Sequence, residues 1–172
     1  NQDSIFTSIE PIGKLPNLFI VADGMGGHKA GDVASRAAIE KFVKYACTTH
    51  MSDPANILDS GIISINKEIY DMAISNKDYS GMGTTFVACS IVDNHVYIAN
   101  VGDSRLYLIG RDIRQITRDH SLVEDMVRMG MIDKEEAKTH YKKNVITKAI
   151  GVADDRTATP DIFEIEISDG EK

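Results

Sequence analysis

Apolar and polar positions follow two different periods along the chain, and the period changes near residue 81. Before that point, apolar residues recur with helical spacing over 30–47 and again over 54–72, which predicts two amphipathic helices lying on a core. Asp53-Pro54 is a strong start signal for the second helix, because Asp is a favoured N-cap and Pro is tolerated at the first helical position. Two such helices in succession predict an antiparallel pair that covers one face of a sheet.

Strand patterns occupy most of the remaining chain. Residues 1–22 predict two strands joined by a turn at Pro11-Ile12-Gly13. Beyond Gly81, short segments rich in Val, Ile, Thr and Tyr are separated by two-residue turns, which join antiparallel neighbours and so predict a meander. The expected strands of this meander are 84–92, 95–101, 104–109 and 112–116.

A helical pattern returns at 121–130, and Asp133 with Glu136 predicts a capping box for another helix. Residues 144–150 are compatible with a strand or with the end of the helical segment that begins at 121. Apolar and polar residues alternate over 162–167, which predicts a last strand. Strands and helices are grouped rather than alternating, which indicates an α+β fold with mostly antiparallel sheets.

Composition narrows the class of protein. A length of 172 residues with 42% hydrophobic and 26% charged residues is typical of one globular domain with a proper core. A net charge of −7 argues against broad binding to nucleic acid or to an anionic membrane. No apolar run approaches the roughly 20 residues that span a bilayer, and the first residues do not form a secretory signal. Cys47 and Cys89 are expected to be buried thiols, which fits a cytoplasmic protein.

The most informative stretch is 18–28, where an apolar run of five residues ends at Asp23. Gly24, Gly26 and Gly27 follow, and glycines let the backbone turn tightly and let a ligand approach closely. A carboxylate beside accessible backbone carbonyls suits a hard cation such as Mg²⁺ or Mn²⁺. The alternative is an ordinary Asp-Gly turn after a strand.

Other acids fall at comparable positions. Asp3 opens the first expected strand, Asp103 lies in a turn between strands, and Asp119 precedes His120. Acids at adjacent strand ends, about 4.8 Å apart, can converge, and converged carboxylates repel each other unless cations neutralise them. Two metals roughly 4 Å apart can hold a bridging hydroxide for in-line attack on phosphorus. The alternative, that each Asp only caps a turn, is favoured for Asp119 and disfavoured for Asp23 and Asp103 together.

Six segments in order along the chain resemble the motifs of metal-dependent protein serine/threonine phosphatases of the type 2C (PPM) family, in its bacterial form. They are Asn1-Gln2-Asp3-Ser4, Val21-Ala22-Asp23-Gly24-Met25-Gly26-Gly27, Gly81-Met82-Gly83-Thr84-Thr85, Asn100-Val101-Gly102-Asp103-Ser104-Arg105, Thr117-Arg118-Asp119-His120-Ser121 and Asn144-Val145-Ile146-Thr147-Lys148-Ala149-Ile150-Gly151. Together they span nearly the whole chain, which makes the resemblance far more specific than any single motif.

The resemblance implies a sandwich of two mostly antiparallel β-sheets flanked by helix pairs. It implies hydrolysis of phosphoserine and phosphothreonine in proteins by water activated at a centre of two Mn²⁺ or Mg²⁺ ions, with a third ion in some bacterial members. Asp23 would bridge both metals, and the carbonyl of Gly24 would bind one of them. Asp3 would bind a metal directly or through a water molecule and orient the metal-bound water, and Asp103 would help to hold the third ion. The implied partners are targets of a bacterial Ser/Thr kinase, and we expect a monomer.

Three departures from the family pattern matter. Met25 stands where many eukaryotic members carry a His, and a thioether cannot donate a proton. His28 is a substitute that we disfavour against a solvent-facing loop His. The family's phosphate-binding Arg would lie upstream of Asn1. Two further metal-binding aspartates come from the family's C-terminal part, and Asp169 is a poor match because Glu171-Lys172 follow it. We therefore expect a catalytic domain that is incomplete at both ends and lacks two ligands.

Two other interpretations stay open. One is a catalytically weak or inactive phosphatase-like domain that binds phosphoproteins or other partners, and the second is a metal-binding sandwich with no phosphate chemistry. Residues 121–143 occupy the position of the family's flap, beside the active site, and contain Met126, Met129 and Met131. Methionines adapt to varied partners, so this segment is a candidate for substrate docking, although ordinary helix packing is the favoured interpretation.

Overall fold

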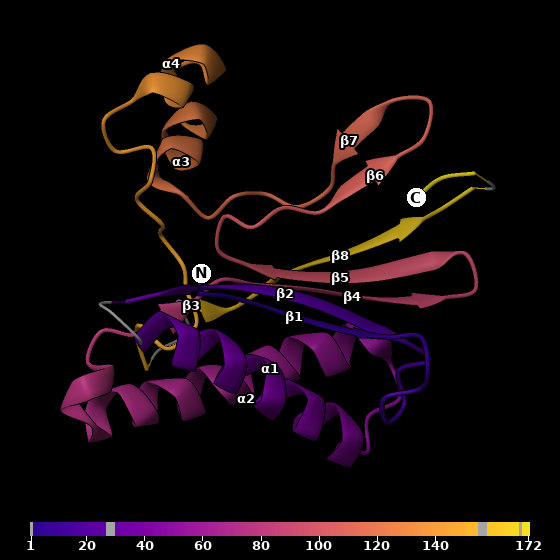
Figure 1. Cartoon of the computed structure of the whole chain (residues 1–172). Helices are drawn as coiled ribbons and strands as arrows, with labels where there is room; N and C mark the ends of the chain where they lie inside the picture. The colour runs from indigo at the N-terminus through magenta and orange to yellow at the C-terminus, as the bar shows by residue number, and fades with distance from the viewer. Residues whose placement is uncertain (1, 27–29, 155–157, 169) are drawn as a thin grey trace.

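The main sheet separates a long helix pair on one side from a hairpin and two short helices on the other (Figure 1). The computed structural model describes residues 2–26, 30–154, 158–168 and 170–172. Its main sheet runs in the order β1-β2-β4-β5-β8, and every pair is antiparallel. These strands are β1 (Asp3–Ser8), β2 (Leu18–Met25), β4 (Phe86–Val92), β5 (His95–Val101) and β8 (Asp161–Glu166), with the short β3 (Gly83–Thr84) pairing with the end of β2.

The predicted helix pair is confirmed as α1 (Ala30–Thr48) and α2 (Pro54–Ser75), which lie under the sheet in Figure 1. Asp53 caps α2 as expected, since its side chain accepts from the N–H of Asn56 at 2.8 Å. The short 3₁₀ turn η1 (Lys77–Tyr79) follows. The core lies between sheet and helices, where large side chains such as Phe42 and Phe86 are fully buried.

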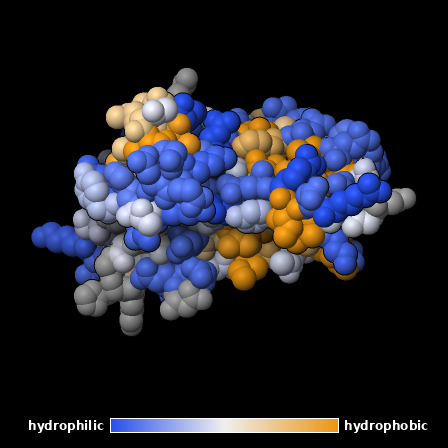
Figure 2. All heavy atoms as spheres, turned by 90° about the horizontal axis from the view of Figure 1, so that it is seen from above, coloured by the Kyte–Doolittle hydropathy of each residue, from blue (hydrophilic) through white to orange (hydrophobic). Residues whose placement is uncertain are grey.

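The two faces of β2 differ, as its alternating pattern predicts. Leu18, Ile20 and Ala22 are buried against the helices, whereas Val21 is 41% exposed on the other face. Ile5 of β1 pairs with Val21 and is 70% exposed. Figure 2, which looks down on the side away from the helices, shows apolar atoms among the hydrophilic ones. The outward face of the sheet is therefore apolar along β1 and β2 and acidic at their end, where Asp3 pairs with Asp23.

Above this face lie a two-stranded sheet, β6 (Tyr107–Ile109) and β7 (Ile113–Gln115), and the helices α3 (Leu122–Arg128) and α4 (Lys134–Thr139) (Figure 1). The capping box predicted at Asp133 and Glu136 is present at the start of α4. The α+β class with antiparallel sheets is confirmed, and within the described part of the chain the second sheet consists of β6 and β7.

Two expectations, the unbroken meander and the buried cysteines, need correction, and the structure decides between the two alternatives left open for 144–150. The meander breaks between β5 and β6, because β4 and β8 occupy both edges of β5 and leave none for β6. Residues 144–150 do not form a strand and contribute only the isolated pairs Ser121–Ile146 and Thr84–Ile150. Cys47 is exposed on α1, and Cys89 is only partly exposed, with burial raising the pKa of its thiol to about 11. No helix in the described ranges has both the length and the apolar character needed to cross a membrane.

Candidate functional site

Asp3 and Asp23 are direct cross-strand partners at one end of the main sheet. Residues opposite each other in an antiparallel pair have Cβ atoms about 4.5–5.5 Å apart, so the two carboxyl groups lie on the same face within reach of each other. Partial burial raises the pKa of Asp23, and the hydrogen bond to Asp3 and the charges of Asp3 and Asp103 raise it further. The structure thus brings together the acids that the sequence singled out at this edge.

Two buried threonines hold the backbone of Asp23. The Thr84 hydroxyl donates to the Asp23 carbonyl at 3.0 Å, and the Thr85 N–H donates to the same oxygen at 2.9 Å. The Asp23 N–H donates in turn to the Thr85 hydroxyl at 3.0 Å. The Thr85 and Ser104 hydroxyl oxygens lie 2.7 Å apart in a further hydrogen bond. Thr85 therefore connects the strand end that carries Asp23 with the turn that carries Asp103.

Gly24 is required by a close crossing of backbones. A Cβ atom added there would lie 2.0 Å from the Gly31 carbonyl oxygen and 2.8 Å from that of Gln2. The Gly24 N–H also donates to the Gln2 carbonyl at 3.1 Å. The absence of a side chain lets the first turn of α1 approach the end of β2, next to Asp23.

Asp103 lies in the turn after β5, where Gly102 has a φ of +106°. Burial raises the pKa of Asp103, and so does the charge of Asp119, whereas the local backbone and Arg105 act in the opposite direction. Asp119 itself is held by Arg105, whose Nε and Nη2 donate to it at 2.9 and 2.6 Å. Asp119 is thus part of an ion pair near Asp103, and it does not join the Asp3–Asp23 pair.

The donor chemistry at this edge fits a divalent cation. Asp3, Asp23 and Asp103 offer oxygen atoms, which Mg²⁺ and Mn²⁺ prefer. Burial is the largest cause of the raised pKa of Asp23, and the charges of Asp3 and Asp103, which a cation would offset, add to it. Within the described ranges, no three His, Cys, Asp or Glu residues are grouped closely enough to hold a metal on their own. His28 and Asp169, both considered in the sequence analysis, lie outside those ranges.

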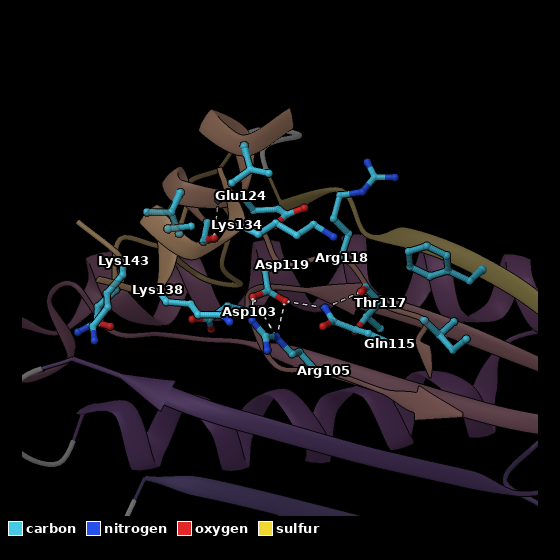
Figure 3. Close-up of a pocket in the computed structure, with 17 residues that line it drawn as sticks. Asp103, Arg105, Gln115, Thr117, Arg118, Asp119, Glu124, Lys134, Lys138 and Lys143 are labelled. Atoms are coloured by element: carbon cyan, nitrogen blue, oxygen red, sulfur yellow. Dashed lines mark hydrogen bonds and ion pairs between the residues drawn. The ribbon is translucent and has the colours of Figure 1, made fainter. Parts of the chain in front are cut away.

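A cleft of about 820 Å³ opens beside Asp103, between the region of the β6–β7 hairpin and the α3–α4 helices (Figure 3). Basic residues outnumber acidic ones in its lining: Arg105, Arg118, Lys134, Lys138 and Lys143 against Asp103, Asp119 and Glu124. Arg105 pairs with Asp119 and Lys138 with Glu135, the latter at 2.7 Å. This basic lining contrasts with the net charge of −7 of the whole chain. The cleft therefore provides positive charge next to the acidic edge.

Comparison with known proteins gives consistent results. Residues 13–125 match the family described as protein phosphatase 2C. A curated relative, the serine/threonine phosphatase stp of Listeria innocua, is 48% identical over 140 residues, which cover 78% of this chain and 56% of the relative. The chain thus spans little more than half the length of that relative.

Two solved structures extend the comparison. The serine/threonine phosphatase Stp1 of Staphylococcus aureus superposes with a TM-score of 0.86 at 38% identity, over 97% of this chain and 66% of that one. The catalytic domain of the phosphatase PstP, solved in complex with two manganese ions, superposes with a TM-score of 0.79 at 30% identity, over 99% of this chain and 68% of that one.

Proposed function

Because the chain belongs to the protein phosphatase 2C family, we propose that it hydrolyses phosphoserine and phosphothreonine in proteins at the acidic end of its main sheet. The observation that carries this proposal is the direct pairing of Asp3 with Asp23, with Asp103 close enough to raise the pKa of Asp23. Three acids crowded at one edge are costly without a cation, so their convergence favours a site for metal-assisted chemistry over a set of unrelated turn caps.

The proposed roles of the residues follow from their positions. Asp3, Asp23 and Asp103, with the backbone carbonyl of Gly24, would hold Mn²⁺ or Mg²⁺; two manganese ions in the related PstP structure support this choice. When bound, these ions supply positive charge for the phosphate oxygens and activate water for attack on phosphorus. Asp23 and Asp3 would orient the attacking water by accepting its hydrogen bonds, which makes them the proposed catalytic residues.

Other residues of the chain support this arrangement. Thr84 and Thr85 fix the peptide of Asp23, so its carboxylate is held in place before substrate binds. The basic lining of the cleft beside Asp103 would attract the anionic segment around a phosphorylated residue. Met25 cannot protonate the leaving serine or threonine oxygen, so that proton would come from water held at the acidic edge.

We propose further that residues 1–172 belong to a single catalytic domain in which 121–143 form a flap-like excursion. The substrates would be targets of a bacterial Ser/Thr kinase, and the protein would act in the cytoplasm as a monomer. Met129 and Met131 are 66% and 64% exposed, so helix packing does not account for them, and this favours the docking interpretation of the flap.

A second candidate function is a phosphoprotein-binding module with little or no turnover. The observation that favours it is that the described acids do not form a group of three that could hold a metal alone. The basic cleft would then be the functional surface. The two candidates differ in whether phosphate is released.

The test measures phosphate release from a phosphothreonine peptide across a Mn²⁺ titration. It uses the 172-residue chain and a chimera in which the chain is continued by the corresponding C-terminal third of Staphylococcus aureus Stp1, because this chain covers 66% of that protein. We expect Mn²⁺-dependent release in the chimera, reduced at least about 100-fold by Asp23→Asn, the size of effect that follows loss of one group that stabilises charge in the transition state. A folded chimera that binds Mn²⁺ and peptide but releases no phosphate would instead support the binding module.

A further inference from the structure

The proposed function leaves His120 without a role, although its side chain is only 6% exposed and makes specific contacts. Its Nδ1 atom accepts the backbone N–H of Gly102 at 3.0 Å. Its Nε2 atom lies 3.2 Å from Oδ1 of Asp161 on β8. The ring therefore stands between β8 and the Val101–Gly102 peptide, in the turn that carries Asp103.

These contacts define the protonation state of the ring. Because Nδ1 accepts a hydrogen bond, the single proton of the neutral imidazole is on Nε2. Among the described residues, Nε2 makes no hydrogen bond of regular geometry, and the Asp161 carboxylate is the charged group that it faces. Asp161 is itself held by Lys148, whose Nζ lies 3.3 Å away. Burial and then the Lys148 charge lower the pKa of His120, which keeps the ring neutral and able to accept at neutral pH.

Hydrogen bonds hold both the N–H and the carbonyl of Gly102. Its carbonyl accepts from the backbone N–H of His120 at 2.9 Å and from Nδ2 of Asn100 at 3.3 Å. A side chain at Gly102 is excluded, because an added Cβ would lie 2.6 Å from Cγ2 of Thr85, and the φ of +106° also favours glycine. The imidazole supplies the acceptor for the N–H in this arrangement.

His120 also lies at the base of the flap-like segment. The Thr147 N–H donates to the His120 carbonyl at 2.8 Å, and the Leu122 N–H donates to the Val145 carbonyl at 2.9 Å. The chain thus leaves and re-enters the fold beside this one residue. His120 connects the flap base and the Asp103 turn through hydrogen bonds, and its neutral ring faces the Asp161 carboxylate of β8.

We propose that His120 is a positioning residue for Asp103: by accepting the Gly102 N–H, it fixes the Val101–Gly102 peptide and with it the turn that holds the Asp103 carboxylate within range of Asp23. This inference rests on the proposed function, because it takes Asp103 as a metal ligand. His120 does not touch the acidic pair in any contact that the structure records, so its effect passes through Gly102. The Asp161 carboxylate, by selecting the Nε2 proton, keeps Nδ1 free to accept.

The test compares three substitutions in the chimera with Stp1 by their effect on Mn²⁺ binding, measured by calorimetry and by manganese electron paramagnetic resonance. His120→Phe keeps the shape of the ring and removes the acceptor. His120→Asn keeps an oxygen acceptor near the Nδ1 position. His95→Phe is the matched control, since His95 also faces a carboxylate between β5 and β8, with Nδ1 3.1 Å from Glu164, but is distant in sequence from the Gly102 turn.

We expect His120→Phe to weaken Mn²⁺ binding about 10-fold, the lower end for loss of a residue that orients a metal ligand. His120→Asn should retain most of the Mn²⁺ affinity that His120→Phe loses, and His95→Phe should bind Mn²⁺ as the wild type does. In an Asp103→Asn background, His120→Phe should cause no further loss, because the two residues act through one contact. Normal Mn²⁺ binding by His120→Phe, or a loss that adds fully to that of Asp103→Asn, would overturn the proposal.

The unmutated protein offers a second test that does not depend on how the variants fold. Nuclear magnetic resonance should show His120 as the neutral Nε2–H tautomer, with a scalar coupling across the hydrogen bond from the Gly102 nitrogen to Nδ1. An Nδ1–H tautomer would overturn the proposal. Failure of the proposed function would look different: wild-type protein and chimera would release no phosphate, whatever the state of His120.

Discussion

At the scale of single residues, the acidic edge depends on neighbours that carry no charge. Thr85 makes three contacts at once: it accepts the Asp23 N–H, donates its own N–H to the Asp23 carbonyl, and shares a hydrogen bond with Ser104. The side chain is 1% exposed, so water cannot replace these partners. One small hydroxyl thus sets the relative position of two turns that bear proposed metal ligands.

Replacing Thr85 by Val tests this role. Valine has the same shape but leaves the Asp23 N–H without its acceptor, and an unsatisfied buried donor costs about 1–3 kcal/mol. We expect the free energy of unfolding, measured in urea, to fall by that amount. Thr48→Val is the control, because its exposed hydroxyl bonds only to carbonyls of its own helix, and it should stay within about 0.5 kcal/mol of wild type. Equal effects of the two substitutions would contradict the assignment.

The burial of His120 leads us to expect that folding stability depends on pH. Its folded-state pKa lies below the ordinary value of 6.5, chiefly because of burial and then the Lys148 charge, with Asp161 acting in the opposite direction. Between the lowered and the ordinary pKa, the unfolded chain binds more protons than the folded one, so folding stability decreases as the pH falls below about 6.5.

We expect urea denaturation at pH 5 and pH 7 to show a smaller difference for His120→Asn than for the wild type, because Asn does not titrate. Asp161 contributes a separate loss at lower pH: burial alone would raise its pKa, but His120 and Lys148 hold it below the ordinary value. An unchanged difference between pH 5 and pH 7 in His120→Asn would show that the ring does not titrate as the structure indicates.

At the scale of elements, close packing decides what the helix pair tolerates. Gly61 in α2 faces α1, and a Cβ added there would lie 2.6 Å from Cε2 of Phe42 and 3.0 Å from Cδ1 of Tyr45. Phe42 is fully buried and cannot move aside. Gly61 therefore allows the two helices to approach closely, at the expense of helix propensity.

The close contact at Gly61 predicts that alanine, which usually stabilises a helix relative to glycine, destabilises the protein here. Propensity alone would make Gly61→Ala stabilising by about 0.8–1.0 kcal/mol, whereas overpacking a filled core costs about 1–3 kcal/mol. We expect a net destabilisation of about 1 kcal/mol, seen as a melting temperature lower by about 2–4 °C. Ser75→Ala at the exposed end of the same helix should leave the melting temperature nearly unchanged. A higher melting temperature for Gly61→Ala would mean that the helices separate more easily than their contact implies.

The α3 and α4 helices form a separable element, since neither contains a buried residue. Because the chain ends of this segment meet at the Leu122–Val145 hydrogen bond, a short Gly-Ser linker can replace 122–143. In the chimera with Stp1 we expect this deletion to leave a folded enzyme with wild-type kinetics on a small phosphate ester. The KM for a phosphoprotein should rise severalfold, because the exposed Met129 and Met131 are lost together with the lysines that this segment contributes to the cleft. An unchanged preference among phosphoproteins would remove the docking role.

At the scale of the whole molecule, strong local patterns predicted the fold well. The helix pair, the Asp53 and Asp133 caps, and the antiparallel pairing of β1 with β2 and β4 with β5 all follow from periodicity and short turns. The break between β5 and β6 could not be predicted, because it depends on β8, about 60 residues further along, occupying the edge of β5. Cys47 was misplaced because its helix position is close to the boundary between the buried and exposed faces of α1.

The candidate site was predicted in part. Asp3, Asp23 and Asp103 stand out in sequence because each lies at a strand end or in a turn beside a strand, and the cross-strand pairing of Asp3 with Asp23 agrees with their expected convergence. The supporting residues Thr85 and His120 could not be found this way. Their roles depend on contacts across 62 and 18 residues of sequence, with Asp23 and Gly102, which no local period encodes.

The central claim is that the acids at the end of β1 and β2 contribute to a divalent-metal site, and calorimetric titration with Mn²⁺ of the chimera that adds the C-terminal third of Stp1 tests it most directly. We expect saturable binding at neutral pH that Asp23→Asn weakens at least about 10-fold, or 1.4 kcal/mol, whereas Asp71→Asn on the exposed side of α2 leaves it unchanged. Saturable binding of equal strength in the unmutated and Asp23→Asn chimeras, or no binding by the folded chimera, would contradict the account.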